Sequence, residues 1–376
     1  AIFLCCCFSV VSMLCYRIIH VIITCVDNAC QFIRYARITY VPVSPHQPPD
    51  RIKSIVNSIS GSFILCCNDN GSLPRVMDSY IPCIEVSQVI GDWGKELTIK
   101  KEERNNKQDD VIIGYDADDN NDDEDRLDDT CWIHMTSGST GVPKGVLASH
   151  RGVLQRCMHK ASILRVNTQS IVLLATPFTF DPYSTDLIST LMHGGCCCSL
   201  TRDGLLHSIS DSIKKSQATH VCATPSLWST TSSIQRNLLP SLRCLTLVGE
   251  RIPDDMLRKW HSFRSSLSFF NVYGVTECVD TQFTCEISLQ EEEHLSPSCV
   301  GIPDPNVKVK LLQLPSSSSS SSSSSFSPSS YHTFVETINT PGEICIGGPQ
   351  VAVGYVSRSE ETSKRFVKLQ HLSQQQ

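Results

Sequence analysis

Residues 136–146, Thr-Ser-Gly-Ser-Thr-Gly-Val-Pro-Lys-Gly-Val, have a composition suited to binding phosphate. They include three glycines, four hydroxyl side chains and one lysine, Lys144. Glycine lets the backbone approach an anion closely, hydroxyl and main-chain N–H groups donate hydrogen bonds, and Lys144 adds positive charge. The spacing is not that of a Walker A loop, because a glycine follows Lys144. The alternative, a plain surface turn, rarely combines these residue types directly after an apolar strand.

A second polar stretch, 271–277, reads Asn-Val-Tyr-Gly-Val-Thr-Glu and follows a strand that contains two phenylalanines. It offers an aromatic face for a base, a hydroxyl for a phosphate oxygen and a hard carboxylate for a hard cation. The alternative is a Tyr-Gly turn with a helix-capping threonine. Two further stretches, 248–250 (Val-Gly-Glu) and 341–355 (Pro-Gly-Glu to Gly-Tyr), follow or contain apolar strand patterns.

Phe180 and Asp181 lie in the stretch 175–182, Ala-Thr-Pro-Phe-Thr-Phe-Asp-Pro, just after an apolar strand. A carboxylate buried there would need a partner of opposite charge. The alternative is that Asp181 only caps a helix that begins near Tyr183.

The elements that would position these residues alternate between short apolar strands and amphipathic helices. Strands are expected at 38–43, 62–66, 131–135, 171–175, 196–200, 220–223, 245–248 and 267–272, and helices from 51 and over 150–164, 186–192 and 205–216. This alternation predicts an α/β fold whose mainly parallel sheet is covered on both faces. Beyond residue 285 β signals dominate, and strands 307–312 and 342–346 are expected to form a long hairpin.

Length, charge and cysteine content limit the class of protein. The chain has 376 residues, enough for two or three packed subdomains, and a formal net charge of −6, which argues against nucleic acid as the main partner. An acidic segment, 101–130, and a serine-rich segment, 315–330, are predicted to be disordered inserts. The 20 cysteines lack zinc-binding spacing and favour a reducing compartment.

Residues 1–37 form an atypical apolar segment, interrupted by Arg17 and His20. Three interpretations compete: a membrane anchor, a signal segment, or a distorted start to a soluble domain. The third is favoured, and a cytoplasmic protein without a membrane partner is expected. Residues 371–376 form a short tail.

These stretches, in this order, resemble the motifs of the adenylate-forming (AMP-binding) enzymes, which include the acyl-CoA synthetases and the peptide-synthetase adenylation domains. The resemblance implies a large N-terminal adenylation domain of the acyl-CoA synthetase type over 38–370, with layered α/β subdomains plus a β-rich part. It implies that ATP and Mg²⁺ activate a small carboxylic or amino acid to an acyl-adenylate. The acyl group would then pass to the thiol of CoA or of a carrier-protein domain's phosphopantetheine arm.

The resemblance also assigns a role to each matching residue. The triphosphate would be held by Thr136, Ser137, Gly138, Ser139, Thr140, Gly141 and Lys144. Tyr273 would stack on adenine, and the other nucleotide-binding residues would be Gly249, Glu250, Asn271, Gly274 and Thr276. The catalytic set would be Lys144, Thr276 and Glu277, with Glu277 also holding Mg²⁺. Phe180 and Asp181 would face the substrate, and Asp181 would pair with the substrate's ammonium group, as in the members that activate amino acids. The residues Thr-Phe-Asp-Pro most resemble those of the β-alanine-activating members.

The chain ends at Gln376, before the family's Thr-Gly-Asp motif and before a small C-terminal subdomain that carries a second lysine. With that subdomain absent, weak nucleotide binding and slow adenylation are expected of this chain alone. Two other classes stay open at this point: a nucleotide-binding fragment or scaffold without catalysis, and a membrane-anchored protein.

Overall fold

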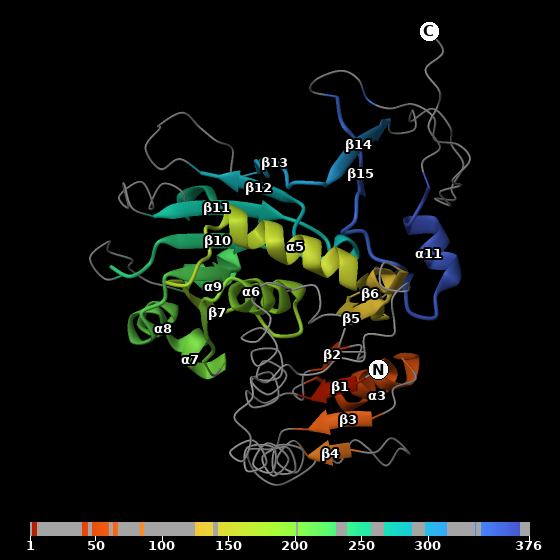
Figure 1. Cartoon of the computed structure of the whole chain (residues 1–376), viewed down its shortest axis with the longest axis horizontal. Helices are drawn as coiled ribbons and strands as arrows, with labels where there is room; N and C mark the ends of the chain where they lie inside the picture. The colour runs from red at the N-terminus through yellow and green to blue at the C-terminus, as the bar shows by residue number, and fades with distance from the viewer. Residues whose placement is uncertain are drawn as a thin grey trace, which may run out of the picture. The chain divides into compact units, whose positions relative to one another are not determined.

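The computed structural model describes residues 2–5, 40–43, 47–59, 63–66, 83–85, 125–137, 142–200, 202–230, 239–256, 267–287, 298–313, 335 and 340–368. The chain divides into two compact units, Ala1–Met135 and Thr136–Gln376, so the domain predicted over 38–370 comprises two bodies (Figure 1).

The first unit is built on a parallel sheet. Its strands are β1 (Ile2–Cys5), β2 (Tyr40–Val43), β3 (Phe63–Cys66), β4 (Cys83–Glu85) and β5 (Thr130–Thr136). They pair in the order β5-β2-β1-β3-β4. Helix α3 (Pro49–Ile59) is amphipathic and buries Ile52 and Ile55. The strands expected at 38–43, 62–66 and 131–135 and the helix from 51 are therefore present.

The second unit holds a seven-stranded sheet in the order β13-β12-β11-β10-β9-β7-β8. Its strands are β7 (Ile171–Leu174), β8 (Cys196–Cys198), β9 (His220–Ala223), β10 (Cys244–Val248), β11 (Ser268–Tyr273), β12 (Phe283–Glu286) and β13 (Ile302–Pro303). The five strands β7 to β11 run parallel to one another. Strand β12 pairs antiparallel with β11, and β13 pairs antiparallel with β12. The predicted α/β arrangement is confirmed.

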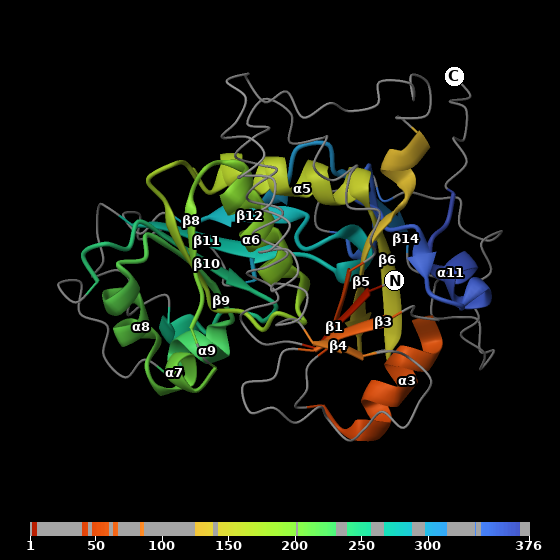
Figure 2. The same ribbon diagram turned by 60° about the horizontal axis from the view of Figure 1, so that its bottom comes forward.

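Helices cover both faces of this sheet because successive strand side chains point to opposite sides. On one face lie α5 (His150–Ile163) and α6 (Asp181–Met192). On the other face lie α7 (Arg202–His207), α8 (Ile209–Ser216) and α9 (Pro225–Ser229) (Figure 2). The apolar core against the second group includes Val221, Leu245 and Phe269, whereas Cys222, Cys244 and Phe270 face α5.

Two antiparallel pairs complete the second unit. Strand β6 (Lys144–Ser149) pairs with β16 (Gly354–Tyr355), which leads into α11 (Ser359–Arg365). Strands β14 (Lys308–Gln313) and β15 (Gly342–Gly347) form the predicted hairpin. The serine-rich insert 315–330 and the tail 371–376 lie outside the described residues.

Several predicted boundaries differ from the structure. Helix α6 begins at Asp181, five residues before the predicted start at 186, because Pro182 is accommodated in its first turn. The helix predicted over 205–216 is divided at Ser208, whose extended backbone and hydroxyl cap α8. A 3₁₀ turn over Asp125–Asp128 precedes β5, so the last residues of the segment 101–130, predicted to be a disordered insert, form regular structure.

Candidate active site

Lys144 begins strand β6, at the end of the glycine-rich stretch. Its backbone carbonyl accepts a hydrogen bond from the Thr136 hydroxyl at 3.4 Å, and its ammonium group forms an ion pair with Glu361 of α11. The Lys144 nitrogen also lies 5.4 Å from the centre of the Tyr355 ring. Ser137 is exposed at the edge of the described segment. The other predicted phosphate ligands, Gly138, Ser139, Thr140 and Gly141, lie outside the described residues.

Glu277 lies in a single 3₁₀ turn, Thr276–Cys278, which follows β11. Its Oε1 accepts a hydrogen bond of 2.7 Å from the Tyr355 hydroxyl. Burial and the neighbouring Glu277 carboxylate raise the pKa of the Tyr355 phenol, so the phenol keeps its proton and acts as the donor. Tyr355 therefore contacts both Lys144 and Glu277, two of the three predicted catalytic residues, and brings them to one place.

Asp181, at the start of α6, has 3% of its surface exposed. Its Oδ2 accepts a hydrogen bond of 2.9 Å from the backbone N–H of Asp280, and Thr276 is a neighbour of its carboxylate. Burial and the nearby Asp280 charge raise the pKa of Asp181 to about 7. The residue before it, Phe180, is the N-cap and makes no side-chain cap bond. The alternative that Asp181 caps a later helix is wrong, since the helix begins at Asp181 itself.

Strand β11 and the turn that follows it hold the other motif residues. Gly274 is required there, because a Cβ atom would lie 2.1 Å from the backbone oxygen of Asp280. Tyr273 is 40% exposed, and its ring contacts that of Phe283, with centroids 6.0 Å apart. The exposed part of the Tyr273 ring is available for stacking. Asn271 is buried and donates a hydrogen bond of 2.7 Å to the carbonyl of Cys299.

The Val-Gly-Glu stretch follows β10. Gly249 has a φ of +85°, and the Phe180 ring would lie 3.5 Å from a Cβ placed there. The carboxylate of Glu250 is exposed and accepts hydrogen bonds from the backbone N–H and the hydroxyl of Ser226, at the start of α9. The structure thus joins Phe180 to Gly249, whereas Glu250 is engaged with α9 rather than with the other predicted site residues.

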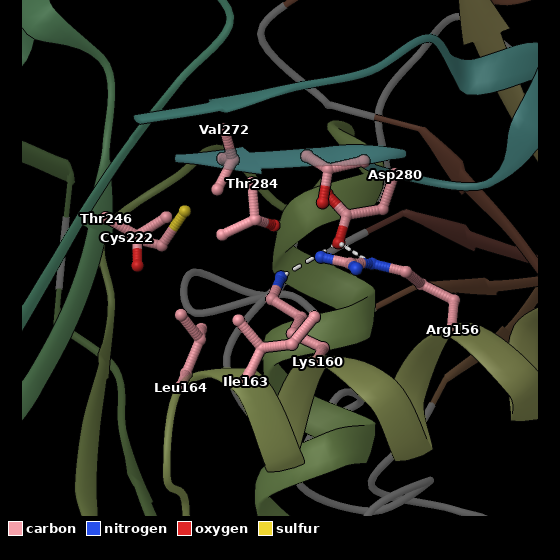
Figure 3. Close-up of a pocket in the computed structure, with 10 residues that line it drawn as sticks. Arg156, Lys160, Ile163, Leu164, Cys222, Thr246, Val272, Asp280 and Thr284 are labelled. Carbon is pink, nitrogen blue, oxygen red and sulfur yellow. Dashed lines mark hydrogen bonds and ion pairs between the residues drawn. The ribbon is translucent and has the colours of Figure 1, made fainter. Parts of the chain in front are cut away.

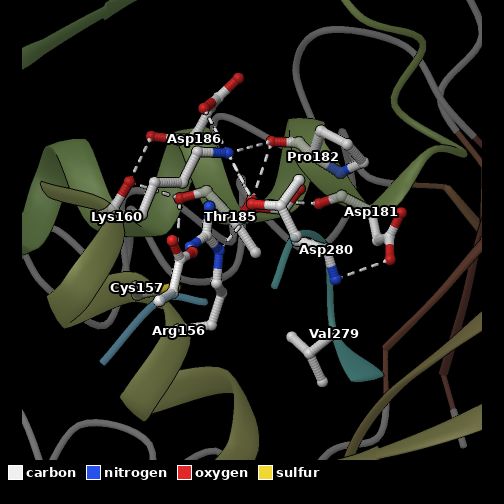
Figure 4. Close-up of polar contacts among 12 residues, drawn as sticks. Arg156, Cys157, Lys160, Asp181, Pro182, Thr185, Asp186, Val279 and Asp280 are labelled. Atoms are coloured by element: carbon white, nitrogen blue, oxygen red, sulfur yellow. Dashed lines mark hydrogen bonds and ion pairs between the residues drawn. The ribbon is translucent and has the colours of Figure 1, made fainter. Parts of the chain in front are cut away.

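A buried cluster of charged side chains supports this region, and the sequence motifs did not reveal it (Figure 4). Lys160 on α5 contacts Asp186 Oδ1 at 2.6 Å and Asp280 Oδ2 at 3.0 Å. Arg156, one turn earlier, contacts Asp280 at 3.0 Å and Asp304 at 2.5 Å. The signal in the sequence was two basic residues four apart on the buried face of a helix, a spacing that places both on one side.

The cluster fixes the position of Asp280, whose backbone N–H contacts Asp181. Burial alone would raise the pKa of Asp280, but Lys160 and Arg156 hold it below its usual range. Asp280 Oδ2 also accepts a hydrogen bond of 2.7 Å from the Thr185 hydroxyl. With its side chain tied to α5 and α6, Asp280 presents its N–H to Asp181 from a fixed position.

A small cavity adjoins this cluster on the sheet side (Figure 3). Among its lining residues are Arg156, Lys160, Val272 and Thr284. The space that the centre of a water molecule can occupy in it is about 10 Å³. Two buried oxygens of its lining residues, Asp280 Oδ1 and Thr281 Oγ1, have no hydrogen-bond partner among the described residues. This volume is near the lower limit for one water, so at most one fits between those atoms.

Comparison with known proteins identifies the family. The sequence matches the family described as "AMP-binding enzyme" over residues 10–356, which includes part of the atypical segment 1–37. The chain therefore belongs to the AMP-binding, adenylate-forming enzymes. The matched range contains all of the motif stretches described above, from Thr136 to Tyr355.

The curated relatives are much longer proteins. The chain is 28% identical to nonribosomal peptide synthetase GRA1 of Gibberella zeae over 328 residues, which are 87% of this chain and 4% of that protein. It is 30% identical to the NRPS-like tryptophan epimerase fscC of Fusarium equiseti over 238 residues, 63% of this chain and 14% of that protein. The chain thus spans a small part of the length of the curated relatives that it matches.

Solved structures show the same fold. The protein PA1221, described as an NRPS protein containing adenylation and PCP domains, aligns with a TM-score of 0.68 at 20% identity, covering 99% of this chain and 55% of that one. The complex of VinN with L-aspartate aligns with a TM-score of 0.65 at 18% identity, covering 96% and 78%. The N-terminal subdomain of Klebsiella oxytoca NpsA gives 0.63 at 20%, covering 89% and 74%. The predicted fold, the large N-terminal part of an adenylation domain, is confirmed.

The described part of the chain holds no helix both long and apolar enough to cross a bilayer.

Proposed function

We propose that this protein uses ATP to activate a small carboxylic acid that carries an amino group, and that it passes the acyl group to a thiol. Family membership supports the adenylation step. The observation that carries the substrate class is Asp181, a buried carboxylate beside Thr276 with no cation among the contacts of its side chain that the structure describes. An ammonium group would supply the missing countercharge.

In the first step, a carboxylate oxygen of the acid forms a bond to the α-phosphorus of ATP. The bond from that phosphorus to the bridging oxygen breaks, and pyrophosphate leaves with the electron pair. Lys144 would neutralise charge on the triphosphate, and Thr276 would donate to the α-phosphate.

A magnesium ion fits the residues present. Mg²⁺ is commonly held by one or two carboxylates together with substrate phosphates and water. Glu277 is such a carboxylate, and the described residues contain no group of three acidic, histidine or cysteine side chains that could form a dedicated metal cage. When bound, the ion would supply positive charge to the phosphates, and Glu277 would orient it.

In the second step, a thiolate attacks the acyl carbon and AMP leaves, which makes the protein an acid–thiol ligase. The nonribosomal peptide synthetases among the relatives favour the phosphopantetheine arm of a carrier domain as the thiol. CoA is the other thiol of this class. β-Alanine is the first acid to test, because of the Thr-Phe-Asp-Pro stretch at 179–182.

Pyrophosphate exchange into ATP tests the proposal in the full-length protein. We expect exchange with β-alanine or an α-amino acid, and at least tenfold slower exchange with propionate, which has no amino group. Transfer is then measured as a thioester on CoA or on a loaded carrier domain. Binding of ATP without exchange for any acid would contradict the proposal and indicate a non-catalytic nucleotide-binding protein.

Glu361 is expected to compete with ATP for Lys144. Their ion pair is partly exposed, at 12% for the Lys144 side chain and 34% for that of Glu361, and it must open when a triphosphate binds. Exposed pairs contribute about 0.2–1 kcal/mol, so Glu361→Gln should lower the dissociation constant of ATP by up to about fivefold. Fluorescence titration with a nucleotide analogue would measure this.

Glu360→Gln is the matched control. Glu360 precedes Glu361 in the chain, but its carboxylate pairs with Lys364 and is 82% exposed. This control should leave the ATP affinity unchanged. Weaker ATP binding in Glu361→Gln would show instead that Glu361 orients Lys144 for the triphosphate.

A further inference from the structure

The segment from Gln350 to Tyr355 lies against the turn that carries Glu277. The Ala352 N–H donates a hydrogen bond of 2.9 Å to the carbonyl of Glu277. The Gln350 side-chain amide is buried and donates to the carbonyl of Thr281 at 3.3 Å. The backbone at Glu277 and in the residues after it is therefore held by residues some 70 positions away in the sequence.

Tyr355 is itself fixed by its surroundings. Its backbone N–H donates to the Thr362 hydroxyl at 3.0 Å, and it pairs with Val146 across β16 and β6. Its ring packs edge-on against Phe366, with centroids 5.3 Å apart. The preceding residue must be glycine: Gly354 has a φ of +151°, and a Cβ there would lie 2.5 Å from the Thr362 methyl. The phenol thus reaches Glu277 from a fixed backbone.

We propose that Tyr355 is the positioning residue for Glu277, and that its hydroxyl sets how tightly the protein holds magnesium with ATP. This inference rests on the proposed function. The hydrogen bond at 2.7 Å engages Oε1 of Glu277, which leaves Oε2 to bind a cation. Magnesium demands near-ideal octahedral geometry, so a carboxylate held in one orientation binds it better than a rotating one.

The Tyr355 ring makes a second contact, with Lys144. The Lys144 nitrogen lies 5.4 Å from its centre, within the range of a cation–π interaction. One side chain therefore touches the lysine proposed for the triphosphate and the carboxylate proposed for the metal. The position of Tyr355 therefore sets the distance between the Lys144 ammonium and the Glu277 carboxylate.

The variant Tyr355→Phe separates this role from packing. It keeps the ring in its apolar cluster with Val146, Ala352 and Phe366 and removes only the hydroxyl. Outer-shell partners of metal ligands typically contribute 10–100-fold to metal affinity. We expect at least a tenfold weaker apparent affinity for Mg²⁺ in the presence of ATP. The affinity for ATP in EDTA should stay within twofold of wild type.

The measurement is a Mg²⁺ titration of the full-length protein with a fluorescent ATP analogue, with three variants in parallel. Glu277→Gln tests the proposed function: if it leaves the Mg²⁺ dependence unchanged, Glu277 does not hold the metal. If Glu277→Gln weakens Mg²⁺ binding and Tyr355→Phe does not, only the positioning role is overturned.

Thr362→Val is the matched control, because it removes the hydroxyl that holds the Tyr355 backbone and leaves the phenol in place. We expect its Mg²⁺ affinity to stay within twofold of wild type. A shift equal to that of Tyr355→Phe would overturn the proposal, because loosened packing alone would then account for the effect.

Discussion

Replacing Asp181 with asparagine is expected to lower kcat/KM for the amino-acid substrate by about 10²–10³-fold, since truncating one partner of a buried charge pair costs 2–5 kcal/mol. The substitution keeps the size of the side chain and an oxygen that can accept from the Asp280 N–H, which lies 2.9 Å from Oδ2. Only the charge is lost. Steady-state exchange kinetics with β-alanine and propionate would measure the change, and the rate with propionate should alter little.

The pH profile provides a second readout of the same variant. Burial and Asp280 raise the pKa of Asp181 to about 7, so its carboxyl group is neutral below that pH and charged above it. An ammonium substrate needs the charged form. In the wild type, kcat/KM for the amino acid should therefore rise as the pH increases through about 7, because kcat/KM reports groups of the free enzyme. Asp181→Asn should lack this limb.

The same raised pKa affects stability with a definite sign. Between the unfolded value near 4 and the folded value of about 7, the native state binds a proton that the unfolded state has lost. The contribution of Asp181 to the free energy of unfolding is therefore fully present below pH 4 and is lost as the pH rises through 7. Asp181→Asn should remove that decline. The control Asp254→Asn, with a 55% exposed side chain, should change neither profile. An unchanged rate limb in Asp181→Asn would contradict the amine-binding role.

The motif residues were predictable from the sequence because each motif is local. Asn271 to Glu277 lie in one strand and turn, and Lys144 ends the stretch that begins at Thr136, so a short window holds each chemical pattern. The strands of the central sheet were also predictable, since a strand buried on both faces reads as an unbroken apolar run. Ile171 to Leu174 in β7 is such a run.

The contacts that join the motifs were not predictable. Tyr355 and Glu277 are 78 positions apart, and Lys160 and Asp280 are 120 apart. Which partner a tyrosine or lysine meets depends on how helices pack on the sheet, and residue spacing along the chain does not encode this directly. The start of α6 was misplaced for a related reason. Asp181 and Pro182 were placed before the helix, but both fit its first turn.

The buried cluster behind the site leads to the largest expected change in stability. The Lys160 ammonium is 3% exposed and contacts Asp186, Asp280 and the Thr185 hydroxyl, the last at 2.8 Å. Burial alone would lower the pKa of Lys160, but the two carboxylates raise it, so the charge persists. Lys160→Met would leave the two carboxylates with Arg156 as the remaining cation of the described cluster. Breaking a buried pair in this way costs about 3–5 kcal/mol.

Urea unfolding at pH 7, followed by tryptophan fluorescence, would measure the loss, and buried Trp228 contributes the signal of the second unit's core. Lys214→Met is the control, because its contact with Asp211 is 3.6 Å long, 39% of its side chain is exposed, and such pairs contribute under about 1 kcal/mol. Adding Asp186→Asn to Lys160→Met should recover part of the stability, since one unpaired charge is removed. A Lys160→Met protein as stable as the control would show that the cluster does not hold Asp280, and the fixed N–H facing Asp181 would need another support.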